Sequence, residues 1–158
     1  MRDFNEALIN AKYHFAVAER MYSSYGEFPD KRFLIGIINE SARAASSLIK
    51  AFLIRANRGS AARGIPSREG TGVPSSSGKD SKKNIKIFME EIAPRYLDDL
   101  TRENLFKVLE VEKAQKTSPI EYAKGDKIIL LIGEKYRFLT VGRIGEFIES
   151  IGIGIEQF

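Results

Sequence analysis

The side chain best suited to acid–base chemistry is His14, the single histidine of this sequence. An unperturbed imidazole titrates near neutral pH, so it can accept or donate a proton during a reaction. His14 stands between Ala11 and Ala18 in an apolar helical pattern, which is more typical of a packed or boundary side chain than of a catalytic base. The alternative is a catalytic role, in which His14 meets an arginine of the neighbouring helix such as Arg43.

A second group of candidate residues is cationic and indicates phosphate binding. Residues 59–83 contain five Lys or Arg residues against Glu69 and Asp80, so three of the four net positive charges lie in this segment. Several cations along one stretch can neutralise a phosphate backbone, although basic segments also serve solubility and the helix dipole. We predict contact with RNA or nucleotides through six side chains: Arg55, Arg58, Arg63, Arg68, Lys82 and Lys83.

No residue pattern indicates a metal site or a cofactor. The chain has no Cys, which excludes disulfides, thiolate zinc sites and cysteine nucleophiles. The pairs Glu90, Glu91 and Asp98, Asp99 occupy adjacent positions, which point in different directions on a helix. Segment 72–80 places Lys after Gly but departs in spacing from a phosphate-binding loop. We therefore predict no metal and no cofactor, and favour a protein without catalysis over an enzyme.

Two long helices must position these side chains. Apolar residues recur every three or four positions from Phe4 to Tyr25 and again from Lys31 to Arg58. Gly26 can end the first helix, and Asp30 can cap the second by accepting hydrogen bonds from free backbone N–H groups. A run of small residues over 41–47 would let another helix approach closely. The sequence predicts an antiparallel helical hairpin.

The segment after this hairpin is rich in residues that do not form a core. Residues 59–81 contain five Gly, six Ser and two Pro, which predicts a flexible basic loop at about 59–80. A helical pattern resumes over residues 81–92 and is broken by Pro94. Another helical pattern begins at Thr101. A further helix start is expected at Ser118, followed by a final helix over 141–151.

Residues 127–141 fit two interpretations. The segment can form two strands about a tight turn at Gly133, because both halves are rich in β-branched and aromatic residues. It can also continue a helix from Ser118, since its apolar residues keep an approximately helical face. We predict the helix and keep the β-hairpin as the alternative.

These patterns together predict an all-α fold. We expect an antiparallel up-and-down bundle of four main helices plus short helices, formed as a single domain over residues 1–158. Hydrophobic residues make up 43% and charged residues 29%, which is typical of a globular protein. Because the chain has neither a membrane-length apolar run nor the apolar block of a signal peptide, we expect a cytoplasmic protein with no membrane partner. Abundant Ile, Lys, Arg and Glu resemble a thermophile's composition.

The segments Ala7–Met21 and Glu40–Leu53 resemble a known family. The first is similar to the first helix of the HEPN superfamily, the small helical-bundle domains named for higher-eukaryote and prokaryote nucleotide binding. The second is similar to that family's second helix, in which small residues precede a lysine, here Lys50, and an apolar end. The resemblance is confined to these two helices.

The HEPN resemblance implies a helical bundle, frequent dimerisation, and roles that range from RNA cleavage in toxin systems to partnership with nucleotidyltransferases. The family's cleavage motif is an Arg followed four to six residues later by a His in a late helix. This chain lacks that pair, because its histidine lies in the first helix. We therefore predict a non-catalytic HEPN-like binding protein that forms a homodimer and contacts RNA or nucleotides. The alternatives are an RNA-cleaving enzyme of divergent HEPN type and a structural or assembly subunit that docks through residues 151–158.

Overall fold

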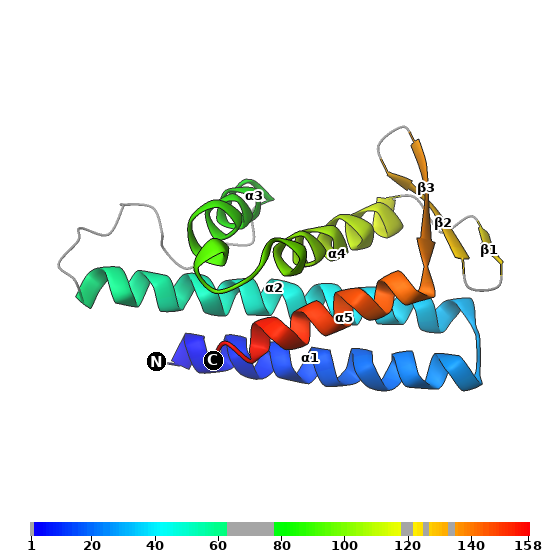
Figure 1. Cartoon of the computed structure of the whole chain (residues 1–158), viewed down its shortest axis with the longest axis horizontal. Coiled ribbons are helices and arrows are strands. Elements are labelled where there is room, and N and C mark those ends of the chain that lie inside the picture. The colour runs from blue at the N-terminus through cyan, green and yellow to red at the C-terminus, as the bar shows by residue number, and fades with distance from the viewer. Residues whose placement is uncertain (1, 63–77, 118–121, 125–126, 133–134) are drawn as a thin grey trace.

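The computed structural model describes residues 2–62, 78–117, 122–124, 127–132 and 135–158. Within them, five α-helices are accompanied by a short π-helix (η1), a 3-10 helix (η2) and a three-stranded sheet (Figure 1). The elements are α1 Arg2–Glu27, α2 Lys31–Ala62, α3 Gly78–Ile87, η1 Phe88–Ile92, η2 Ala93–Arg95, α4 Asp99–Thr117, β1 Tyr122–Lys124, β2 Lys127–Ile132, β3 Lys135–Thr140 and α5 Val141–Ile155. The predicted helical bundle is confirmed.

The α1–α2 pair is the antiparallel hairpin that the sequence predicts (Figure 1). Asp30 caps α2, because its Oδ1 accepts a hydrogen bond from the Arg32 backbone N–H at 2.8 Å. The predicted end of this helix at Arg58 is wrong, since α2 continues through Gly59 to Ala62. Ala is the strongest helix former, so two alanines at 61–62 favour the helix over the break that glycine suggests.

The predicted loop at 59–80 is therefore shorter at both ends. Residues 59–62 belong to α2, and residues 78–80 belong to α3. Residues 63–77, which include Arg63 and Arg68, lie outside the described part of the chain.

Helix α5 packs against both arms of the hairpin. Its glycines permit this approach, since a Cβ placed at Gly152 would lie 3.0 Å from the Phe15 ring, and one at Gly154 would lie 2.6 Å from Leu48. Within residues 151–158, Ile151 is fully buried and the Phe158 ring lies 4.6 Å from that of Phe52, while Ile153 and Phe158 remain 37% and 36% exposed. The largest fully buried side chains of the core are Phe52, Phe88, Phe147, Leu34, Ile37, Ile38, Leu48, Leu105, Ile144 and Ile151.

The chain between α3 and α4 changes direction near Pro94, as predicted. Helix α3 passes into η1 and then η2, which contains this proline. Helix α4 then begins at Asp99, and the preceding Asp98 caps it by accepting a hydrogen bond from the Thr101 backbone N–H at 2.7 Å. The predicted helix from Thr101 is confirmed, with its start two residues earlier.

The predicted helix over residues 127–141 is wrong, and the alternative β-hairpin is present. Strands β2 and β3 pair antiparallel, with Ile129 opposite Phe138, and β1 lies on the other edge of β2. β-Branched and aromatic side chains fit a pleated surface, and this preference favours the strands that pair over residues 127–140. Residues 118–121, where the sequence predicts a helix start, lie outside the described residues. Helix α5 confirms the final helix, which extends to Ile155.

Among the described residues, no helix is both long enough and apolar enough to cross a membrane.

Candidate functional site

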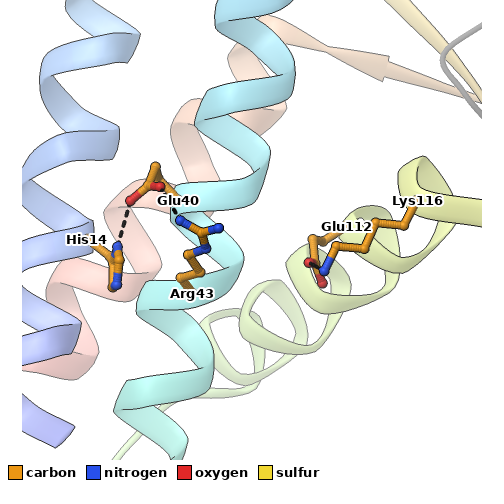
Figure 2. Close-up of polar contacts among 5 residues, drawn as sticks. All are labelled: His14, Glu40, Arg43, Glu112 and Lys116. Atoms are coloured by element: carbon orange, nitrogen blue, oxygen red, sulfur yellow. Dashed lines mark hydrogen bonds and ion pairs between the residues drawn. The ribbon is translucent and has the colours of Figure 1, made fainter.

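The antiparallel register of α1 and α2 brings His14 against Glu40. The Nδ1 atom of His14 lies 2.6 Å from Oε2 of Glu40, so the two side chains are joined across the helix interface (Figure 2). The His14 side chain is 21% exposed and the Glu40 side chain 16%, which places the contact near the surface of the bundle. The carboxylate fixes Nδ1 of an imidazole held in this way, and the other ring nitrogen can still accept or donate a proton.

The second carboxylate oxygen of Glu40 accepts a hydrogen bond from Arg43. The Nη1 atom of Arg43 lies 3.0 Å from Oε1, and the Arg43 side chain is 63% exposed. Glu40 thus bridges an imidazole on α1 and a guanidinium on α2. We name these three residues the His14–Glu40–Arg43 cluster.

The cluster lies on the side of the hairpin that α5 does not cover. Phe15 and Tyr22, seven residues apart on one face of α1, approach Gly152 and Gly145 of α5. His14 directly precedes Phe15 in the sequence, so its side chain points away from the face that α5 covers. In Figure 2, α5 passes behind the helix pair. Figure 2 also shows a separate ion pair, Glu112–Lys116, on α4.

This geometry has a defined chemical capacity. A carboxylate that fixes one imidazole nitrogen leaves the other to take a proton from a hydroxyl group, and an exposed arginine can neutralise a nearby phosphate. The sequence identifies His14 and Arg43 as a potential pair, and the structure brings them together through a shared partner. Sequence reasoning missed that partner, Glu40, because its position opposite His14 depends on the helix register. The available signal was the spacing of three residues between Glu40 and Arg43.

The cationic candidates on α2 are held against aromatic rings. The Arg55 guanidinium lies 5.2 Å from the ring centre of Tyr96 and 5.3 Å from that of Phe158. Arg55 also donates a hydrogen bond from Nη1 to the Gln157 backbone carbonyl at 2.8 Å. The Arg58 guanidinium lies 5.5 Å from the Phe4 ring centre, and both arginines are exposed. These are cation–π contacts, which restrict where each guanidinium can lie.

The remaining predicted cations divide into two sets. Lys82 and Lys83 are exposed on α3, a different element from the α2 arginines. Arg63 and Arg68 lie outside the described residues. The structure therefore brings Arg55 and Arg58 together at one end of α2 and places the two lysines together on α3.

The acidic residues near α4 have structural partners. The Thr101 backbone N–H and hydroxyl hold the pKa of Asp98 below its usual value, and nearby Arg102 acts in the same direction. The hydrogen bond and charge of Lys107 likewise lower the pKa of Glu103. Across the described ranges, no three His, Asp or Glu side chains are grouped so that they could hold a metal ion.

No protein-family model, curated protein or solved structure matches this chain. The HEPN resemblance therefore stays a prediction, and function must be argued from the geometry of the described residues.

Proposed function

We propose that this protein binds RNA or nucleotides as a non-catalytic, HEPN-like helical bundle, through cations at the C-terminal end of α2. The observation that carries the proposal is the pair Arg55 and Arg58. Both side chains are exposed, they stand three residues apart, and each lies on an aromatic ring. The pair presents two oriented positive charges on one end of the bundle.

Ring contacts favour phosphate binding because they orient the arginine without using its donors. A guanidinium carries five N–H donors, so one that lies over a ring can still donate two hydrogen bonds to a phosphate. Arg55 uses one such donor on the Gln157 carbonyl. A side chain already held in position loses less conformational entropy when a ligand binds.

The sequence contains four further predicted cations. Arg63 and Arg68 follow Arg58 along the chain, and Lys82 and Lys83 follow them. Each phosphate neutralised on a single strand changes the slope of log affinity against log salt by about −0.7. If all six predicted cations act, the slope should reach about −4.

Fluorescence anisotropy with a labelled single-stranded RNA at several salt concentrations tests this proposal. We expect Arg58→Gln to weaken binding and to reduce the slope by about 0.7, and the double variant of Arg63 and Arg68 to Gln to reduce it by about twice that. Arg20→Gln is the matched control, because it removes one exposed cation from α1. Binding that is absent, insensitive to salt, or equally affected by Arg20→Gln would reject the proposal.

A second candidate function is RNA cleavage, which the His14–Glu40–Arg43 cluster specifically favours. In this alternative, the second nitrogen of His14 removes the proton of a ribose 2′-hydroxyl while Arg43 neutralises the adjacent phosphate. The 2′-oxygen then bonds to phosphorus, the bond from phosphorus to the 5′-oxygen breaks, and the leaving 5′-oxygen takes a proton from water. Glu40 orients the imidazole through its 2.6 Å contact. Single-turnover cleavage assays should then show a loss of about 10²–10⁴-fold in His14→Ala. Full activity in that variant would exclude the enzyme alternative.

We further propose that the protein forms a homodimer through a helical face. Ile9 and Tyr13 are exposed and stand four residues apart on the outer side of α1, which would suit such a contact. Light scattering of the wild-type chain and of Ile9→Asp tests this, and a wild-type chain that is strictly monomeric at high concentration would reject the dimer. The cytoplasmic location stays a prediction from sequence.

A further inference from the structure

The β-hairpin presents two aromatic rings to solvent. Tyr136 is 59% exposed and Phe138 is 72% exposed, although both lie on strand β3. Residues two apart on a strand point to the same face, so the two rings share one side of the sheet. Leu139 points to the opposite side and is buried. The face with Leu139 therefore meets the core only at that position of β3, since Lys135 and Arg137 on the same face are exposed, and the other face carries exposed aromatic surface.

Strand β2 extends this aromatic face. Ile129 stands directly opposite Phe138, and Lys127 stands opposite Thr140, on the same face as the two rings. Ile129 is partly exposed and Lys127 is exposed. We name Lys127, Ile129, Tyr136 and Phe138 the hairpin platform.

The charged residues of the sheet indicate which type of ligand it would attract. Every charged position within the three strands is a cation, and Lys127, Lys135 and Arg137 are exposed. Because side chains alternate along a strand, Lys135 and Arg137 of the edge strand β3 point to the face opposite the two rings, whereas Lys127 lies on the same face as the rings. The neighbouring acids, Glu121, Asp126 and Glu134, are in the connecting segments, for which no placement is described. Exposed aromatic rings with Lys127 on the same face, and two more exposed cations on the other face of the edge strand, complement a ligand with planar apolar groups and negative charge.

We propose that the hairpin platform binds single-stranded nucleic acid by stacking bases on Tyr136 and Phe138. Nucleobases stack on exposed aromatic rings of a sheet, and their backbone phosphates are attracted by adjacent Lys and Arg side chains. Stacking needs no particular base, so the site discriminates single strands from duplex rather than one sequence from another. This binding site is separate from Arg55 and Arg58, and it does not require that they bind phosphate.

Anisotropy measurements with a labelled oligouridylate of about 12 nucleotides test the platform. We expect Tyr136→Ala and Phe138→Ala each to weaken binding at least about fivefold, and the double variant to weaken it further. Tyr136→Phe keeps the ring and should bind like wild type. Leu100→Ala is the matched control, because Leu100 is an exposed apolar residue, at 61%, near the start of α4. A duplex competitor should displace the oligonucleotide poorly.

The salt dependence separates this site from the α2 arginines. Loss of a ring should lower affinity and leave the slope of log affinity against log salt unchanged, whereas Arg58→Gln should reduce the slope. Undiminished binding by the double ring variant, with its circular dichroism unchanged, would overturn the platform. The competing occupant of the platform is a second copy of this chain, and light scattering of the same variant tests for it. A dimer that dissociates on loss of the rings, without any change in oligonucleotide affinity, would make the platform a contact between copies.

Discussion

The buried pair Asn104 and Ser150 gives a test of how α4 and α5 are held together. The Nδ2 group of Asn104 donates a hydrogen bond to Oγ of Ser150 at 2.9 Å, and both side chains are buried. Ser150→Ala removes the acceptor with almost no change in shape. It leaves a buried N–H group without a partner, and such a group costs about 1–3 kcal/mol of unfolding free energy.

Adding Asn104→Leu to Ser150→Ala should recover most of this loss. Leucine keeps the branching of asparagine and has no polar group to desolvate, so replacing both partners is close to neutral. The change also removes the Oδ1 atom of Asn104, which is buried and accepts no hydrogen bond from the described residues. The expected result is therefore a destabilised single variant and a double variant near wild type.

Urea unfolding followed by circular dichroism measures each free energy. Ser46→Ala is the matched control, because it makes the same chemical change at an exposed position of α2 and should change stability by no more than about 0.5 kcal/mol. A neutral Ser150→Ala, or a double variant that is less stable than the single one, would show that this hydrogen bond does not carry the stated energy.

Three further predictions concern packing and pH. Phe52→Ala should lower the free energy of unfolding by about 3–5 kcal/mol in urea, because Phe52 is fully buried against several rings. Gly154→Ala should destabilise by about 1–3 kcal/mol, since its Cβ would meet the buried Leu48, whereas Gly59→Ala, with no atom within 4 Å, should stabilise by up to about 1 kcal/mol. The pKa of Asp98 is lowered in the folded state, so its contribution is present above the unfolded pKa and is lost as pH falls below about 4. Asp98→Asn should therefore show a smaller loss of stability between pH 7 and pH 3 than wild type, and an equal loss would contradict the capping role.

The helical hairpin was predictable because its information is local. Apolar residues recur along α1 and α2 at helical spacing, and Asp30 supplies a cap that the structure contains. The end of α2 was not predictable from Gly59 alone, since one glycine inside a helix costs only about 1 kcal/mol and two good helix formers follow at 61–62. Segment 127–141 was ambiguous because its apolar residues satisfy both periodicities, and pairing between strands decides between them.

The candidate site was predictable in its residue types and not in its contacts. His14, Arg43, Arg55 and Arg58 are identifiable as charged or titratable side chains in helical patterns. Their partners come from distant parts of the chain: Glu40 from the opposite helix, and the rings beneath Arg55 and Arg58 from Phe4, Tyr96 and Phe158. Such contacts depend on how helices and chain ends meet, which local patterns do not encode.

Arg55 and Arg58 therefore have different roles despite their shared charge and spacing. Arg55 donates to the Gln157 carbonyl and stacks on Phe158, so it fixes the end of the chain to α2 as well as carrying charge. Its loss would disturb packing next to Phe52, whose ring also contacts that of Phe158. Arg58 contacts the ring of Phe4, a partly buried residue near the start of α1 whose ring lies 5.7 Å from that of Phe158. Arg55 touches the C-terminal segment directly and Arg58 touches it through Phe4, so a change in RNA binding on substitution of Arg58 reports on phosphate contact with less disturbance of packing than the same change at Arg55.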